Sequence, residues 1–272
     1  MDWIHALIMG IVQGLSEYLP ISSSGHLVIC SEILGLDMTG AESVEFDVML
    51  HVATVLSTIV VLWKEFMPLC TSFFTVKRDY NFYYVLKILL SCIPVAIVGL
   101  LFKSQVEALF GSGLTIVGAC LCATAALLTF SYFYRTSPAT AKSYTPHDIT
   151  WSDAFVIGCA QAVAVLPGLS RSGSTIATGI ILGDDREKVA KFSFFMVIIP
   201  ILGEALLGIK DLITVGPTGD IGFIPMIVGF LASFAVGCAA CRWMISIVKK
   251  GKLIWFAVYC LIVGIAALIY SF

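Results

Sequence analysis

The sequence predicts an all-helical integral membrane protein that forms one domain over residues 1–272. Hydrophobic residues make up 59% of the chain. Charged residues make up only 12%, whereas a soluble domain carries about 25%. The mean hydropathy is +0.98, so too little polar surface is present to cover a water-soluble globule. Lipid is therefore expected to face most of the surface.

Net charge and cysteine content exclude several other classes. The net charge is −2 and no basic patch is present, so no nucleic-acid partner is expected. The nine cysteines lie mostly in apolar runs, where cysteine behaves as a small apolar residue. Cys238 and Cys241 have CxxC spacing but lack a second pair, so we expect no metal or redox role. Residues 1–19 lack the basic start and cleavage site of a signal peptide.

Apolar segments of two lengths alternate along the chain. A spanning helix needs about 20 apolar residues. Six segments approach this length and are predicted to cross the membrane: 47–63, 84–102, 113–134, 189–209, 222–247 and 253–272. Four shorter segments form two pairs: 3–18 with 26–36, and 151–166 with 172–183.

Each short pair is interrupted by a stretch of proline, serine and glycine, at residues 19–25 and 166–173. Two short helices joined by such a break are typical of a re-entrant hairpin. Irregular backbone at membrane depth persists only where it lines a polar cavity or is buried in protein. The breaks are therefore candidates for a polar site.

The two breaks resemble each other and predict an internal repeat. Gln13 precedes Ser22 by nine positions, and Gln161 precedes Ser170 by nine. Both stretches contain Leu-Pro, displaced by one position, and both end in Ser-x-Ser-Gly. Each is followed by three long segments. We therefore expect repeat 1 at about 1–134 and repeat 2 at about 150–272, each with one hairpin and three spanning helices.

The distribution of Lys and Arg predicts the orientation, because cytoplasmic loops are enriched in both. Alternate loops are rich in them: Lys64, Lys77, Arg78, Arg135, Lys142, Arg186, Lys188, Lys191, Lys249, Lys250 and Lys252. In this orientation the first hairpin opens outward and the second inward, so the repeats are inverted. Inverted repeats with broken helices are common in transporters, with the polar site where they meet.

Three ionisable residues fall at the hairpin tips: Glu17, His26 and Arg171. Ionisable groups at membrane depth are costly and commonly functional. Arg171 can bind phosphate oxygens bidentately. Glu17 can ligate Mg²⁺ or Ca²⁺ or act as a base. His26 can transfer a proton or attack phosphorus.

The residues around these three add hydrogen-bond donors and helix N-termini, which also favour phosphate. The candidate binding residues are Ser22, Ser23, Ser24, Gly25, Gln161, Ser170, Ser172, Gly173 and Thr175. Structural alternatives exist for each taken singly: a helix-end position for Glu17, and capping for His26 and the serines. Arg171 has the weakest such alternative. The roles of His51 and Glu204 stay open at this point.

These motifs resemble those of the undecaprenyl-diphosphate phosphatases of the bacitracin-resistance type. Gln13-Gly14-Leu15-Ser16-Glu17 fits the family's (Glu/Gln)xxxGlu motif, and Ser22-Ser23-Ser24-Gly25-His26 continues it. Residues 167–173 fit its PGxSRSG motif, and length and hydropathy extend the resemblance over the whole chain. The resemblance implies hydrolysis of undecaprenyl diphosphate to the monophosphate and inorganic phosphate, which recycles the lipid carrier for peptidoglycan.

The resemblance also implies a bacterial plasma membrane, a site open to the outer face, a divalent cation and, in many members, a homodimer. By position, Gln13 and Glu17 would bind the cation or serve in acid–base work. Ser23 and His26 would be the candidate nucleophile and its partner, and Arg171 would hold the diphosphate. Gln13 departs from the glutamate often found in the family and cannot act as a base.

A second lipid-phosphatase family, the PAP2 type, also ends a motif in Ser-Gly-His. Its next motif, SRx5Hx3D, would require His and Asp where this chain has Ala177 and Ile181. That family is excluded. Two readings besides the phosphatase remain open: a transporter or flippase of an anionic polyprenyl-phosphate lipid, and a purely structural membrane protein. The attacking group also remains open between Ser23, His26 and water.

Overall fold

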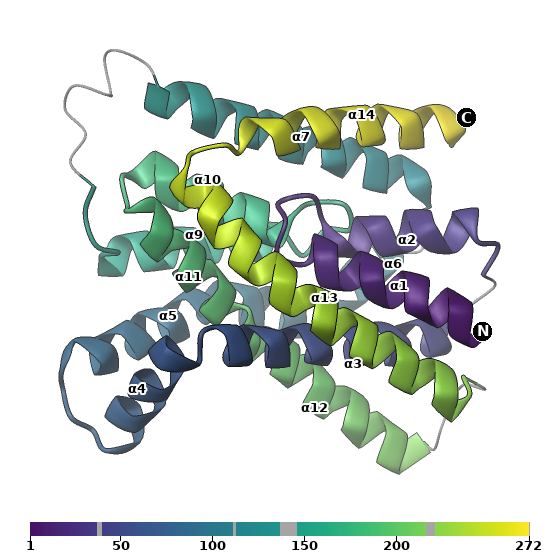
Figure 1. Cartoon of the computed structure of the whole chain (residues 1–272), viewed down its shortest axis with the longest axis horizontal. Helices are drawn as coiled ribbons and strands as arrows, with labels where there is room; N and C mark the ends of the chain where they lie inside the picture. Colours follow the sequence, from purple (N-terminus) through teal and green to yellow (C-terminus); the bar gives the residue numbers. More distant parts are fainter. Residues whose placement is uncertain (37–39, 111–112, 137–145, 216–220, 272) are drawn as a thin grey trace.

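The computed structural model of the protein describes residues 1–36, 40–110, 113–136, 146–215 and 221–271 (Figure 1). Every named element in these ranges is a helix, as predicted. The helices are α1 (Trp3–Ser16), α2 (Ser23–Ile33), α3 (Gly40–Val61), α4 (Trp63–Phe74), α5 (Tyr80–Leu101), α6 (Lys103–Phe110), α7 (Leu114–Thr136), α9 (Trp151–Val163), α10 (Arg171–Leu182), α11 (Arg186–Met196), α12 (Ile198–Val215), α13 (Phe223–Lys249) and α14 (Ile254–Tyr270).

Both predicted interruptions are present, between α1 and α2 and between α9 and α10. Each second helix begins with the same cap. The Ser22 side chain accepts from the backbone N–H of Gly25, and the Ser170 side chain accepts from that of Gly173. A capping side-chain oxygen satisfies one of the backbone donors at a helix start that otherwise lack partners. Re-entry of either pair into a membrane stays a prediction.

The long apolar helices confirm a multi-pass membrane protein, but the count of six spans is not reproduced. Four helical stretches in the described chain are long and apolar enough: 80–101, 114–135, 186–208 and 223–249. A fifth requires α3 and α4 together, and these are bent by 92°. The last predicted span forms α14, with 17 residues. Helices α4 and α6 also occupy segments that the sequence assigned to loops.

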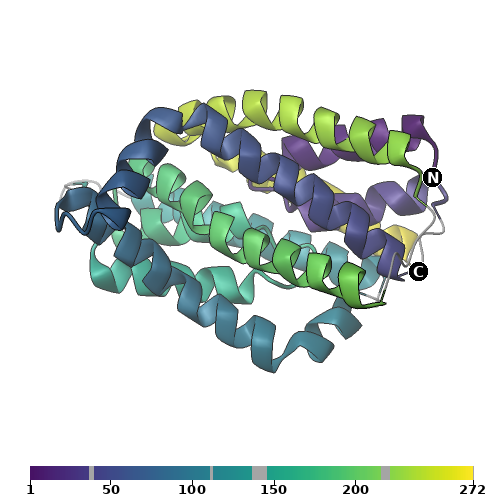
Figure 2. The same cartoon turned by 90° about the horizontal axis from the view of Figure 1, so that it is seen from below.

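Helices from the two halves of the chain pack in reciprocal pairs: α1 lies against α13, α9 against α5, and α7 against α14 (Figures 1 and 2). Small residues permit close approach. A Cβ added to Gly14 would lie 2.5 Å from the Ser233 carbonyl oxygen on α13, and one added to Gly118 would lie 2.8 Å from that of Gly264 on α14. Small residues at crossings are typical of helix packing in membranes.

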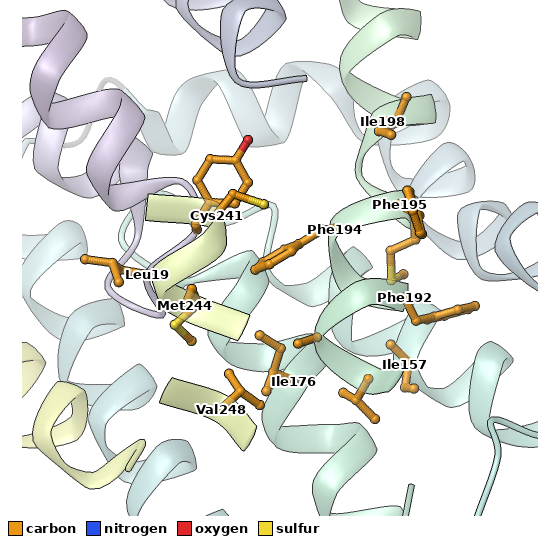
Figure 3. Packing of buried hydrophobic residues seen from close by; sticks show 14 of the residues in the cluster. Leu19, Ile157, Ile176, Phe192, Phe194, Phe195, Ile198, Cys241, Met244 and Val248 are labelled. Atoms are coloured by element: carbon orange, nitrogen blue, oxygen red, sulfur yellow. The ribbon is translucent and has the colours of Figure 1, made fainter. Parts of the chain in front are cut away.

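The phenylalanines of α11 lie in the main apolar cluster. Phe192 and Phe194 are buried there beside Ile157 of α9, Ile176 of α10 and Met244 of α13 (Figure 3). The Tyr18 ring, in the first break, packs edge-on against Phe194 with centroids 5.2 Å apart. The core therefore ties the first break to the helices of the second half.

Gly158 should be the least tolerant of these close contacts. A Cβ at Gly158 of α9 would lie 2.4 Å from the Ser91 carbonyl oxygen on α5. Gly158→Ala is therefore expected to lower the melting temperature in detergent, because overpacking costs about 1 to 3 kcal/mol. Gly203→Ala is the matched control, since nothing lies within 4 Å of its added Cβ. Equal melting temperatures for the two variants would contradict this packing.

The described segments rich in Lys and Arg lie at one end of the molecule, and Lys142 falls outside the described residues. The turn between α4 and α5 lies opposite the two chain termini in both views (Figures 1 and 2). Lys249, at the end of α13, contacts Glu187 of α11 at 2.8 Å. Lys191 of α11 contacts Glu65 of α4 at 3.1 Å. These ion pairs gather the ends of three helices on the side predicted to be cytoplasmic.

A cluster at the same end joins the segment before α9 to the turn after α10. His147 Nδ1 lies 3.2 Å from Asp184 Oδ1 and 4.0 Å from Asp153 Oδ2. The three side chains have the spacing of metal ligands. However, Nδ1 also lies 3.0 Å from the Asp148 carbonyl oxygen, which can only accept a hydrogen bond. The nitrogen that faces the carboxylates therefore carries a proton and acts as a donor.

This cluster predicts that stability falls as pH rises. Burial and the adjacent Asp153 carboxylate raise the pKa of Asp184 from 3.8 to about 7, although His147 opposes the shift. The Asp148 carbonyl and the carboxylates raise the pKa of His147 above 6.5. In both cases the folded state holds a proton that the unfolded chain releases at lower pH, so stability is lost as pH rises through each folded pKa.

Melting temperatures in detergent at about pH 6 and about pH 8 measure this linkage. In Asp184→Asn the melting temperature should fall less between these two pH values, because only the part due to His147 remains. An unchanged slope in Asp184→Asn, or a melting temperature that rises with pH, would contradict the assignment.

Candidate active site

The two breaks meet in space. A Cβ added to Gly25 would lie 2.9 Å from the Gly168 Cα, and the Ser172 hydroxyl donates to the Leu19 carbonyl at 3.1 Å. Gly168 has φ of +90°, and its own added Cβ would lie 2.5 Å from the Val117 carbonyl oxygen of α7. Glycine is therefore required there for both conformation and space. The prediction that the repeat brings the hairpin tips together is correct.

Glu17 is the centre of the polar contacts at this junction. Its Oε2 accepts from Ser23 Oγ at 2.7 Å and from Gln13 Nε2 at 2.9 Å. His51 Nε2 lies 3.5 Å from the same oxygen. Its Oε1 accepts from Arg171 at 3.1 Å. Only 7% of the Glu17 side chain is exposed, so its charge is compensated by donors from both halves of the chain.

Arg171 is the first residue of α10, directly after the Ser170 cap. Its side chain is 25% exposed and lines the cleft described below, and one guanidinium nitrogen contacts Glu17. In the described part of the chain, the contact with Glu17 is the one hydrogen bond that this guanidinium makes. Because Arg has five N–H donors, the group retains capacity for a ligand with several oxygens.

A cleft of about 380 Å³, the space at its mouth included, adjoins this pair. Polar groups lie on several of its walls, and apolar side chains of α3, α11 and α12 complete it. It is lined by Glu17, Tyr18, Thr54, Val55, Thr58, Gln161, Arg171, Ser172, Thr175, Ser193, Phe194, Val197 and Ile201. Four of the predicted site residues therefore share one cleft with Glu17: Gln161, Arg171, Ser172 and Thr175.

His26 is held in a different environment. Its Nδ1 lies 2.8 Å from the Ser22 carbonyl oxygen, so Nδ1 carries the proton in neutral imidazole. Its Nε2 lies 2.8 Å from the Tyr259 hydroxyl of α14, and the two rings stack with centroids 5.6 Å apart. Among its described polar contacts none is with Glu17. The structure thus separates the two candidate nucleophiles, with Ser23 on the carboxylate and His26 on Tyr259.

The remaining predicted residues lie around the junction with local partners. Ser22 and Ser170 cap helices, and the Ser22 hydroxyl lies 3.4 Å from that of Ser24. Gly173 packs beside Pro20. These contacts leave the predicted binding role of the serines open while confirming that two of them act as caps.

Three residues near the site were not predicted as members: His51 beside Glu17, Tyr259 beside His26, and Ser193 in the cleft. His51 was an open candidate. Tyr259 and Ser193 carried no signal, because tyrosine and serine are ordinary in apolar helices. Glu204, also left open, is exposed on α12 and does not line the cleft.

Comparison with known proteins gives the family. The family model described as bacitracin resistance protein BacA matches residues 6–266. This chain belongs to the BacA family. A Bacteroides fragilis undecaprenyl-diphosphatase is 55% identical over 272 residues, which cover 100% of this chain and 99% of the relative. A Bacteroides thetaiotaomicron undecaprenyl-diphosphatase is 55% identical over 270 residues, 99% of each chain.

More distant BacA relatives extend the same match. A Methanosphaera stadtmanae protein, also named undecaprenyl-diphosphatase, is 35% identical over 286 aligned positions, which cover 100% of this chain and 99% of the relative. The predicted family resemblance is therefore confirmed over the full length of the chain. The range matched by the family model contains both breaks, with Glu17 and Arg171.

Proposed function

We propose that this chain is an undecaprenyl-diphosphatase whose reaction centre is Glu17 with Ser23 and Arg171. It hydrolyses undecaprenyl diphosphate to undecaprenyl phosphate and inorganic phosphate, which returns the lipid carrier to cell-wall synthesis and confers bacitracin resistance. The observation that carries this centre is the 2.7 Å hydrogen bond from Ser23 Oγ to Glu17, with Arg171 on the other carboxylate oxygen. The relatives supply the substrate, and the geometry supplies the roles.

In the proposed chemistry Ser23 attacks the terminal phosphorus. Its hydroxyl proton passes to the Glu17 carboxylate as the Oγ–P bond forms and the bridging P–O bond breaks, releasing undecaprenyl phosphate. A water molecule then attacks the phosphorus of the phosphoserine, the Oγ–P bond breaks, and inorganic phosphate leaves with the remaining water proton. Glu17 returns its proton to the Ser23 oxygen, which restores the starting state. Arg171 stabilises the charge that develops on the phosphoryl oxygens. Ser23 is favoured over His26 because both ring nitrogens of His26 already have partners.

The residues present fit a divalent cation that arrives with the substrate. Gln13 Oε1 is buried and accepts no hydrogen bond in the described part of the chain, and Glu17 lies one helical turn away. An amide oxygen and a carboxylate suit Mg²⁺ or Ca²⁺, whose remaining ligands would be phosphate oxygens and water. When bound, the cation would neutralise charge on the diphosphate. Gln13 itself cannot serve as a base.

The proposed arrangement in the plasma membrane is six crossings plus two re-entrant hairpins in two inverted repeats, with the site open to the outer face. The reciprocal packing of α1 on α13 and α9 on α5 supports the inverted repeat. The Lys- and Arg-rich segments at the end opposite the termini support the orientation. Reporter fusions at Lys77 and Gly219 should report opposite sides. A homodimer remains a prediction of the family resemblance.

Phosphate release from undecaprenyl diphosphate by the purified protein in detergent tests the function. Ser23→Ala should lower kcat about 100-fold or more and abolish any trapped phosphoenzyme, because the nucleophile is lost. Ser31→Ala, on the same helix and bonded locally to the Val28 carbonyl, is the matched control and should retain activity. A phosphoenzyme that persists in Ser23→Ala would move the nucleophile elsewhere.

The proposed inverted repeat also supports one alternative, a transporter or flippase of an anionic polyprenyl-phosphate lipid. Tight binding of undecaprenyl diphosphate without phosphate release, with any divalent cation, would contradict the enzyme. Transfer of the lipid between the leaflets of vesicles would then be the activity to measure.

A further inference from the structure

One buried donor in the cleft has no role in the chemistry above. The Gln161 side chain is 1% exposed and lines the cleft with Arg171. Its Nε2 has no hydrogen-bond partner in the described part of the chain. A buried N–H group without a partner is unfavourable, and native proteins satisfy most such groups with protein, water or ligand.

The internal repeat explains why this amide is left over. Gln13 and Gln161 occupy matching positions in the two halves. The Gln13 amide finds an acceptor four residues later, in the Glu17 carboxylate. The residue four positions after Gln161 is Val165, which offers no side-chain acceptor. Gln13 thus donates to a carboxylate, whereas Gln161, a residue of the cleft wall, keeps a buried Nε2 without an acceptor in the described part of the chain.

The neighbours of Gln161 in the cleft are also donors. The hydroxyls of Thr175 on α10 and Ser193 on α11 lie 2.6 Å apart, and both residues line the cleft. Thr175 Oγ1 also lies 2.8 Å from the Arg171 carbonyl oxygen, so its single proton has two acceptors in reach. When Thr175 donates to Ser193, the Ser193 O–H is left for a ligand. Arg171 contributes its guanidinium from the start of α10. The one carboxylate among the cleft-lining residues is Glu17, which Arg171 compensates. Amide, hydroxyl and guanidinium donors together suit the oxygens of a phosphate group.

We propose that Gln161, Thr175 and Ser193 form a second phosphate subsite on the wall of the cleft made by α9, α10 and α11. It adjoins the centre at Glu17, Ser23 and Arg171, and it holds a phosphate group other than the one under attack. Free inorganic phosphate and the phosphate of a lipid headgroup share this chemistry. The inference rests on the proposed function, because a diphosphate substrate and its two products supply both kinds of group.

Product inhibition of the purified full-length protein in detergent tests the subsite. Undecaprenyl diphosphate is the substrate, and inorganic phosphate and undecaprenyl phosphate are the two inhibitors. The variants are Gln161→Met, which retains the length of the side chain, and Ser193→Ala. The matched control is Ser174→Ala, because the Ser174 hydroxyl is buried on α10 but does not line the cleft. Melting temperatures establish that each variant is folded. If Gln161→Met does not fold, the result for Ser193→Ala decides.

The inhibition constant of one product should rise about three- to tenfold in both cleft variants, as expected for loss of a hydrogen bond, and change less than about twofold in the control. A rise for inorganic phosphate assigns the subsite to the phosphate ion after its release from the reaction centre. A rise for undecaprenyl phosphate assigns it to the headgroup. Inhibition by both products that is unchanged in folded variants overturns the inference and leaves the function intact. No phosphate release by the unaltered protein overturns the function itself.

Discussion

Replacing Glu17 with glutamine is expected to lower kcat for phosphate release about 100- to 10,000-fold, the range associated with loss of a general base. The amide keeps the size of the side chain but cannot take the Ser23 proton. It also presents an N–H group to donors on Ser23, Gln13 and Arg171, all of which now point at carboxylate oxygens. Gln13 offers no replacement base. Initial rates of phosphate release, at saturating lipid, measure the effect.

Glu204→Gln provides the matched control, since it makes the same substitution at an exposed position of α12 outside the cleft. Its kcat should equal that of the unaltered protein. A second comparison separates chemistry from folding. Glu17→Gln should retain cooperative thermal unfolding, so a folded variant with undiminished kcat would remove Glu17 from the reaction.

The sequence was sufficient to place Glu17 and Arg171 together because the signal was redundant. Two breaks of similar composition, each with charged or polar residues that membrane segments rarely tolerate, allow few arrangements that avoid isolated charges in lipid. The repeat then predicted which tips must meet. The 3.1 Å contact between Arg171 and Glu17 agrees with that reasoning.

The partners contributed by distant helices could not be predicted in the same way. Tyr259 reaches His26 from α14, and Ser193 reaches Thr175 from α11. Both lie in segments whose hydrophobic pattern does not show which face of the helix points into the protein. His51 was visible as an ionisable residue, but its proximity to Glu17 depends on how α3 lies against the first break.

The length of spanning elements was the least predictable feature of the fold. Hydropathy measures apolar content but not direction, so it could not reveal the 92° bend between α3 and α4. The predicted span at 189–209 matches the helical stretch 186–208, but hydropathy could not show that α11 ends within it at Met196 and α12 begins at Ile198. The wall of the cleft is built at this junction, where Phe194, Val197 and Ile201 line it. The site thus uses a feature that hydropathy averages out.

Replacing Arg171 with alanine is expected to lower kcat about 100- to 1,000-fold, as for loss of one stabilising donor to a developing oxyanion. The melting temperature should also fall, because the largely buried Glu17 carboxylate loses its cationic partner. Arg171→Lys should recover part of the stability but less of the rate, since lysine keeps the charge without the planar set of donors. Phosphate release and thermal unfolding in detergent measure both quantities.

Arg242→Lys, at an exposed position of α13, controls for the substitution itself and should be neutral. The double variant Glu17→Gln with Arg171→Ala isolates the effect of Arg171 on stability. Removing both charges leaves no unpaired carboxylate, so the melting temperature should lie above that of Arg171→Ala, while kcat stays low because the base is absent. A melting temperature no higher than that of Arg171→Ala would show that the unpaired carboxylate is not the cause of the loss. The effect on rate is decided by Arg171→Lys: if stability and rate recovered together, Arg171 would act only by holding Glu17, whereas recovery of stability alone assigns the guanidinium a contact with the phosphate.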